Sequence, residues 1–165
     1  MLEMNLKSFE DYINKSKTED KFMLELGSGI STELFARNFK SVFSYENNLE
    51  YMMTLPRFDN VEYINIDDCR DCYFSDIAHF MKDADYIFID NDPKYIKREI
   101  VMYYACKYAK PNCKIILDNG LWNIKAQRYL QKRYFCKDFF GMREEGVFTN
   151  TIVGEMKIPD YYKKI

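Results

Sequence analysis

Histidine is the scarcest chemically active residue in this sequence, with a single copy among 165 residues. A lone histidine excludes His-rich metal sites and argues against most histidine-based catalytic triads. Glycine and proline are also scarce, at 6 and 4 residues, and no repeat, linker or low-complexity tract is visible. No stretch approaches the roughly 18–20 apolar residues that a membrane-spanning helix needs. We therefore expect a protein that does not associate with membranes.

The sequence also lacks a surplus of charge of either sign. Its 24 basic and 26 acidic side chains leave a net charge of −2. Without an excess of Lys and Arg to neutralise phosphates, general nucleic-acid binding is not expected. The hydrophobic share of 47% excludes a disordered chain, and the charged share of 30% excludes a membrane-embedded one. The length fits one domain that covers residues 1–165.

The five cysteines are odd in number and lie within or beside apolar runs. This usage indicates reduced thiols rather than a disulfide framework. The N-terminus is amphipathic and acidic, without the basic start and apolar run of a signal peptide. Both observations predict a cytoplasmic protein.

Short apolar runs alternate with helical stripes along the chain. The runs predict strands at 22–26, 41–45, 61–66, 85–90, 114–118, 134–140 and 147–154. The stripes predict helices at 5–17, 31–38, 47–55, 73–83, 94–109 and 121–132, with Pro93 at the start of the fifth. This order predicts a Rossmann-like α/β fold, with a doubly wound, mostly parallel, seven-stranded sheet and helices on both faces. The last two strands have no helix between them and should form an antiparallel hairpin.

A glycine turn follows the first predicted strand, in the segment Glu25–Thr32, which reads ELGSGIST. Gly27 and Gly29 let the backbone come close to a ligand, and the next helix supplies unpaired N–H groups at its start. Thr32 stands where a dinucleotide-binding fingerprint has its third glycine. The turn alone is equally consistent with a tight strand-to-helix connection.

Acidic residues end the next two predicted strands, at Glu46 and at Asp67. Ligands of open α/β sheets bind beyond the carboxyl ends of the strands, and a carboxylate there can accept hydrogen bonds from ribose hydroxyls. Each acid by itself is typical of a solvated loop. Together with the glycine turn, the two acids predict a nucleoside pocket.

These residues resemble the class I S-adenosylmethionine-dependent methyltransferases over about residues 20–155. LELGSGIST is similar to their first motif, and Tyr45-Glu46 is similar to the end of their second. The resemblance implies that Glu46 holds the ribose, that Asp67 lies near the adenine amino group, and that the glycine turn faces the methionine portion with Glu25. The cofactor-binding residues that we predict are Glu25, Gly27, Ser28, Gly29, Glu46, Asp67 and Asp90.

Three oxygen-bearing side chains end the fourth and fifth predicted strands: Asp90, Asp118 and Asn119. These strands are neighbours in a doubly wound sheet, so the side chains can converge on one point. Two carboxylates and an amide oxygen suit Mg²⁺, which could lower the pKa of a substrate hydroxyl and orient it. The alternative is that Asp118 and Asn119 only cap the following helix.

The segment 118–122, DNGLW, resembles the signature of the catechol and caffeoyl-CoA O-methyltransferases. The resemblance implies a metal site at Asp90, Asp118 and Asn119. Those relatives place a lysine base three residues after the first metal acid, where this chain has Pro93. Lys94 follows one residue later, so we name Asp90 and Lys94 as the catalytic candidates.

The function expected from these patterns is S-adenosylmethionine-dependent methylation of a small hydroxylated molecule, with Mg²⁺ as a possible helper. Two alternatives stay open: a metal-independent methyltransferase of another acceptor, and a non-catalytic module that binds a nucleoside cofactor. A nicotinamide-dependent oxidoreductase ranks below them because the third glycine is missing. A small-molecule substrate and a possible homodimer are the partners that the sequence suggests.

Overall fold

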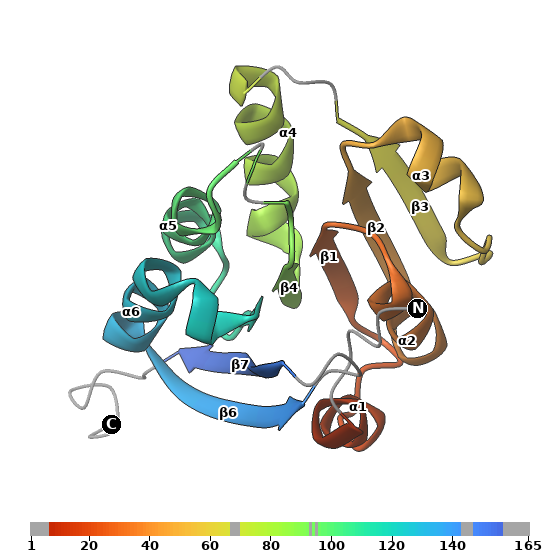
Figure 1. The fold of residues 1–165 in the computed structure, drawn as a ribbon. Helices are drawn as coiled ribbons and strands as arrows, with labels where there is room; N and C mark the ends of the chain where they lie inside the picture. The colour runs from red at the N-terminus through yellow and green to blue at the C-terminus, as the bar shows by residue number, and fades with distance from the viewer. Residues whose placement is uncertain (1–6, 67–69, 93, 95, 143–146, 157–165) are drawn as a thin grey trace, which may run out of the picture.

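A single seven-stranded sheet organises the described part of the chain (Figure 1). The computed structural model describes residues 7–66, 70–92, 94, 96–142 and 147–156. The strands are β1 (Phe22–Leu26), β2 (Ser41–Glu46), β3 (Val61–Asn65), β4 (Tyr86–Ile89), β5 (Lys114–Asp118), β6 (Tyr134–Met142) and β7 (Phe148–Met156). The helices are α1 (Lys7–Asn14), α2 (Ile30–Asn38), α3 (Leu49–Thr54), α4 (Arg70–Asp83), α5 (Arg98–Tyr108), the 3₁₀ turn η1 (Gly120–Trp122) and α6 (Ile124–Arg133).

The sheet has the order β3-β2-β1-β4-β5-β7-β6. The first five strands pair in parallel, and β7 pairs antiparallel with both β5 and β6. This arrangement confirms the predicted doubly wound sheet with a terminal antiparallel hairpin. Helical crossovers return the chain in the same direction, whereas β6 and β7 follow one another with no helix between them.

Helices cover both faces of the sheet (Figure 1). On one face α4, α5 and α6 pack over a core that includes Leu24, Ile87 and Ile115. On the other face α1 and α2 pack over a largely aromatic core. Strand residues alternate between the two cores because successive side chains point to opposite faces, which is why β1 and β5 are buried almost throughout.

Helix α5 begins at Arg98, four residues later than the sequence predicted. Between β4 and α5 the side chains bond to the local backbone and compete with the helix. Asn91 donates from Nδ2 to the carbonyl of Ile96 at 2.6 Å, and Asp92 Oδ1 accepts from the amide of Lys94 at 2.8 Å. Lys94 therefore lies in an exposed turn and not at a helix N-terminus.

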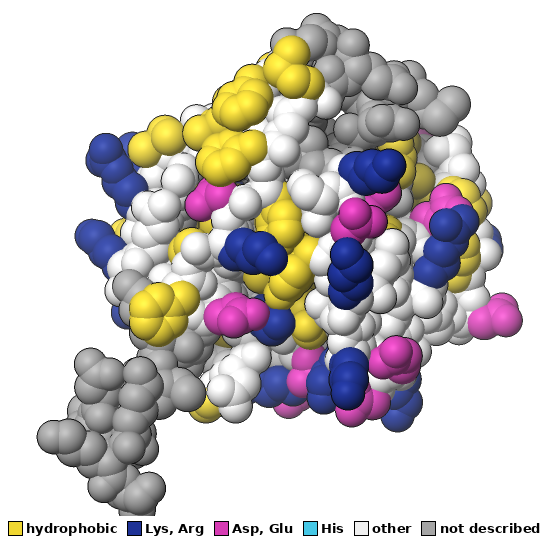
Figure 2. All heavy atoms as spheres, turned by 90° about the horizontal axis from the view of Figure 1, so that it is seen from below, with side chains coloured by type: hydrophobic (Ala, Val, Ile, Leu, Met, Phe, Trp, Pro, Cys, Tyr) yellow, Lys and Arg dark blue, Asp and Glu magenta, His cyan; other side chains and the backbone are white. Residues whose placement is uncertain are grey.

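No helix within the described ranges is long and apolar enough to cross a membrane. Cys106 and Cys113 are buried thiols that form no disulfide. Figure 2 shows the side of the molecule that carries β6 and α1, where basic and acidic side chains are interspersed around hydrophobic ones.

Candidate active site

The strand order reverses beside β1, whose neighbours are β2 on one side and β4 on the other. Open α/β sheets bind ligands at such a switch point, beyond the carboxyl ends of the strands. At this edge the chain places acidic residues at or near the ends of four strands. These residues are Glu25, Glu46, Asp90 and Asp118.

Gly27 opens the turn between β1 and α2 with a φ of +101°, a conformation that residues with a side chain rarely adopt. A Cβ atom there would lie 2.7 Å from the carbonyl oxygen of Asp90 and 2.9 Å from the amide nitrogen of Asn91. The glycine turn and the segment after β4 are thus in backbone contact. The positive φ and the lack of room for a Cβ atom both require glycine at this position.

Glu25 lies fully buried beneath this turn. Its carboxylate accepts hydrogen bonds from Ser31 Oγ at 2.6 Å, from Thr32 Oγ1 at 2.7 Å and from Ser44 Oγ at 2.5 Å. Thr32 Oγ1 also accepts from the amide of Gly29 at 3.0 Å. Glu25 therefore ties the first turn of α2 to β2 and holds the glycine turn between them.

Burial raises the pKa of Glu25 to about 7, against the three hydroxyl hydrogen bonds, which lower it. The nearby carboxylate of Glu46 raises it further. The folded state thus binds a proton that the unfolded chain has already released between pH 4.5 and 7. The contribution of this bound proton to the unfolding free energy is fully present below the unfolded pKa of 4.5. It is lost as the pH rises through about 7.

We expect Glu25→Gln to remove that pH dependence. Between pH 5 and pH 8 the wild type should lose on the order of 2–3 kcal/mol more unfolding free energy than the variant. Urea denaturation at a series of pH values measures the difference. The exposed Glu62 provides the control, because in Glu62→Gln the unfolding free energy should change with pH as it does in the wild type. An unchanged slope in Glu25→Gln would contradict the assignment.

Glu46 ends β2 and is 8% exposed. Its Oε1 accepts a hydrogen bond from the amide of Asn48 at 2.8 Å, which fixes the carboxylate at the edge of the sheet. Tyr51, on the following helix, has a raised pKa because of burial and then because of the carboxylates of Glu46, Glu25 and Asp90. Tyr51 is 43% exposed and lies on α3, the helix that follows β2.

Asp90 follows β4 and forms a buried ion pair with Arg98, with 2.5 Å between Oδ1 and Nη2. The same guanidinium donates from Nη2 to the carbonyl of Asp90 at 3.0 Å, from Nε to the carbonyl of Asn91 at 2.9 Å, and from Nη1 to the carbonyl of Asp118 at 2.7 Å. Arg98 therefore bridges the carboxyl ends of β4 and β5.

Asp118 and Asn119 interact with the terminal hairpin. Asp118 Oδ1 accepts from Thr151 Oγ1 at 2.8 Å, and Asn119 donates from Nδ2 to Thr149 Oγ1 at 3.1 Å. Asn119 adopts a left-handed conformation, with φ of 53°, at the start of η1, and its side chain makes no capping hydrogen bond there. The Asn119 side chain therefore bonds to β7 and does not cap the turn that follows it.

The three predicted metal ligands, as arranged, do not fit a divalent cation. The guanidinium of Arg98 lies against Asp90 on the side of Asp118, and a second cation there would meet its positive charge. Asp118 and Asn119 turn polar atoms toward β7. Elsewhere in the described ranges, no group of three or more His, Cys, Asp or Glu could hold a metal. The magnesium site stays a prediction without structural support.

Two other predicted site residues contribute less to this picture. Lys94 is exposed in the turn before α5. Asp67 lies outside the described residues, as does Pro93. The catalytic role of Lys94 and the adenine contact of Asp67 remain predictions.

The sequence interpretation missed Arg98, Ser44 and Tyr51. Arg98 lies among several cations of one helical stripe, and no local pattern marks it as the buried one. Ser44 is a small polar residue inside an apolar strand, at the position that pairs with Glu25 across β1 and β2. The register that pairs Ser44 with Glu25 was the signal that could have identified Ser44, because a buried acid needs donors on the neighbouring strand.

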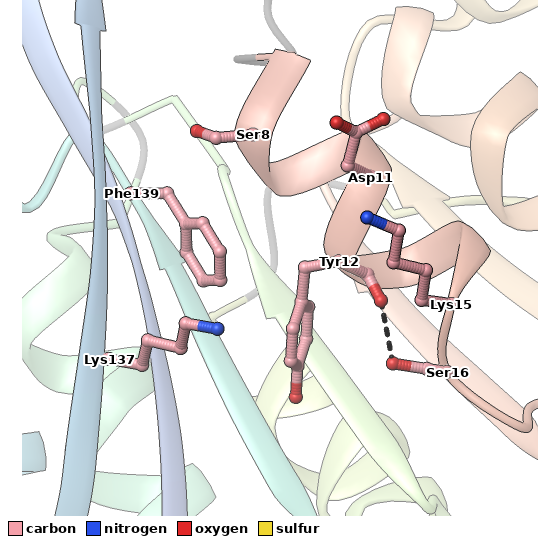
Figure 3. A pocket seen from close by; sticks show the side chains of 7 residues that line it. All are labelled: Ser8, Asp11, Tyr12, Lys15, Ser16, Lys137 and Phe139. Atoms are coloured by element: carbon pink, nitrogen blue, oxygen red, sulfur yellow. Dashed lines mark hydrogen bonds between the residues drawn. The ribbon is translucent and has the colours of Figure 1, made fainter.

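A separate pocket of about 610 Å³ lies between α1 and β6 (Figure 3). Its lining combines an aromatic pair, Tyr12 and Phe139, with hydroxyl groups and charges of both signs. The Tyr12 hydroxyl accepts a hydrogen bond from Lys114 at 3.0 Å, at the amino end of β5. The pocket therefore lies on the α1 side of the sheet, beside its β6 edge.

Comparisons with known proteins show likeness at the level of structure. The sequence matches no protein-family model and no curated protein. An O-methyltransferase from Bacillus cereus in complex with SAH is similar, with a TM-score of 0.73, 17% identity and coverage of 94% of this chain and 84% of that chain. The O-methyltransferase TomG from Streptomyces achromogenes, in complex with SAM, has a TM-score of 0.63, 14% identity and coverage of 85% and 74%.

The same fold is shared with a spermidine synthase from Thermotoga maritima, with a TM-score of 0.64, 12% identity and coverage of 87% of this chain and 56% of that chain. At such identities the likeness establishes the fold and leaves the reaction to the residues of the site. The strand order, the terminal hairpin and these neighbours agree: the chain has the fold of the class I S-adenosylmethionine-dependent methyltransferases.

Proposed function

We propose that the protein is an S-adenosylmethionine-dependent methyltransferase that methylates an oxygen of a small hydroxylated molecule. The observation that carries the proposal is the edge of the sheet where Gly27, Glu25 and Glu46 lie around the switch point. Structural neighbours that include O-methyltransferases support the choice of reaction.

The residues present fit the cofactor. Glu46 offers a fixed carboxylate for two ribose hydroxyls, and Tyr51 offers a partly exposed aromatic ring on the helix that follows. The glycine turn brings backbone close to a ligand at the start of α2, whose N-terminus favours negative groups such as a carboxylate. Glu25 supports the glycine turn from beneath, because its buried carboxylate accepts hydrogen bonds from Ser and Thr hydroxyls.

The cofactor supplies a methyl group already activated on a sulfonium, so the protein has to orient the acceptor hydroxyl and weaken its hold on the proton. The turn between β4 and α5 presents Asp92 and Lys94, both exposed, as the candidate bases. Trp122 is 53% exposed after β5 and offers a flat surface to an acceptor. Magnesium has no step in this mechanism, because the guanidinium of Arg98 already pairs with Asp90.

Calorimetric titration with S-adenosylhomocysteine tests the proposal. We expect binding with a dissociation constant in the micromolar range, about −8 kcal/mol, and no saturable binding of NAD. Tight binding of NAD without binding of S-adenosylhomocysteine would sink the proposal in favour of an oxidoreductase. If S-adenosylhomocysteine binds as expected, methyl transfer to any small hydroxylated acceptor would exclude the alternative of a non-catalytic binding module.

A further inference from the structure

Arg98 is a buried cation in an electrostatically unfavourable place. It is 7% exposed and is the first residue of α5, where the helix dipole favours negative groups. A buried charge at that position persists only if nearby groups compensate for the lost hydration and for the dipole. The chain provides this compensation through the carboxylate of Asp90 and three backbone carbonyls.

The geometry of these bonds requires a guanidinium. Donors from all three nitrogens of Arg98 reach acceptors on two different strand ends, those of β4 and β5. A planar fork can satisfy such a set at once, whereas a lysine ammonium is a single point with a different reach. The side chain therefore fixes the distance between the two strand ends and also neutralises the Asp90 carboxylate.

The bridge also reaches the glycine turn. The carbonyl of Asp90 accepts from Arg98, and the same carbonyl oxygen would lie 2.7 Å from a Cβ at Gly27. The amide nitrogen of Asn91, whose carbonyl accepts from Arg98 Nε, would lie 2.9 Å from that Cβ. A shift of the segment after β4 would therefore displace one wall of the turn. Arg98 controls that wall although it lies eight residues beyond Asp90.

We propose that Arg98 is a positioning residue that supplies a fixed internal cation at the carboxyl ends of β4 and β5, where the sequence predicts a divalent cation. Cofactor binding then needs no divalent cation. The consequence for methyl transfer rests on the proposed function, but the structural role of Arg98 does not.

The first arm of the test uses the wild-type protein and MgCl₂ alone. Calorimetry up to about 10 mM Mg²⁺ should show no saturable binding. The melting temperature and the affinity for S-adenosylhomocysteine should be the same, within about twofold, in EDTA and in Mg²⁺. Saturable Mg²⁺ binding that Asp90→Asn abolishes would overturn the proposal.

The second arm compares Arg98→Ala, Arg98→Lys and a control, Arg133→Ala. Arg133 also donates to a backbone carbonyl, that of Cys106, but on α6 and in an exposed position. Arg98→Ala should lower the melting temperature by about 10 °C, because it leaves the Asp90 carboxylate buried without its ion pair. Arg98→Lys should recover only part of this loss, and the control should change little.

Chemical rescue separates positioning from general loss of packing. Methylguanidinium at about 20 mM should raise the melting temperature of Arg98→Ala by a few degrees and improve its affinity for S-adenosylhomocysteine, with neither effect in Arg133→Ala. A wild-type melting temperature and affinity in Arg98→Lys would overturn the proposal. If Arg98→Ala does not fold, Arg98→Lys and the Mg²⁺ titration decide.

The two proposals fail in different ways. If the wild type binds no S-adenosylhomocysteine, the proposed function is wrong, and the melting temperatures and the Mg²⁺ titration still report on Arg98. If the wild type binds S-adenosylhomocysteine only with Mg²⁺, the proposed function holds and the role of Arg98 is wrong.

Discussion

Substitution of Gly27 by alanine should abolish cofactor binding and destabilise the fold. Gly27 has a φ of +101°, and its added Cβ would lie 2.7 to 2.9 Å from backbone atoms of Asp90 and Asn91. Backbone atoms cannot rotate away as a side chain can, so the ends of β1 and β4 would have to separate. We expect a loss of about 2–4 kcal/mol in unfolding free energy, from strain and overpacking together.

The effect on the cofactor should be larger than the effect on stability suggests, because the turn itself forms the pocket. We expect the affinity for S-adenosylhomocysteine to fall by about 100-fold, measured by calorimetry. Gly154→Ala is the matched control. Its added Cβ would meet the Leu130 side chain at 2.7 Å on the α6 face, so it should cost stability and leave affinity unchanged. Wild-type affinity in Gly27→Ala would show that the ligand does not contact the turn.

Glu46→Gln should weaken cofactor binding by about 10- to 100-fold and change the unfolding free energy by less than about 1 kcal/mol. A carboxylate can accept from both ribose hydroxyls, whereas an amide offers one acceptor and turns a donor toward the other hydroxyl. The bond from the amide of Asn48 to Oε1 can be kept by the amide oxygen of glutamine.

Binding of adenosine identifies the part of the ligand that Glu46 contacts. Adenosine carries the same ribose without the methionine portion, so Glu46→Gln should weaken adenosine and S-adenosylhomocysteine by a similar factor. The control is Glu50→Gln, on the exposed surface of α3, which should bind both ligands as the wild type does. Equal affinities in Glu46→Gln and the wild type would remove Glu46 from the ribose site.

The positions of the acidic residues could be read from the sequence because they depend on local structure. Each predicted strand is a short apolar run, and Glu46 and Asp118 end theirs as expected. The carboxyl ends of parallel strands meet at one edge, so residues distant in sequence were expected on the same side of the molecule. The fold class followed from the alternation of runs and stripes, since crossover handedness leaves few arrangements.

The start of α5 was misplaced because two effects compete there. Proline at a first helical position favours an early start, near Lys94. The side chains of Asn91 and Asp92 instead bond to the backbone between β4 and α5, and the helix begins at Arg98. Such a competition is decided by geometry that propensities do not contain.

The sequence by itself determined the sheet, the glycine turn and the edge on which the acids lie, because these follow from periodicity and from the ends of strands. Only the tertiary structure decided what each acid contacts. Glu25 meets Ser44 through the registry of two strands, and Asp90 meets Arg98 through the docking of a helix that starts late. Ligand sites depend on a few ångströms of such packing, so Asp90, one of the acids that predict a metal site, instead pairs with the guanidinium of Arg98.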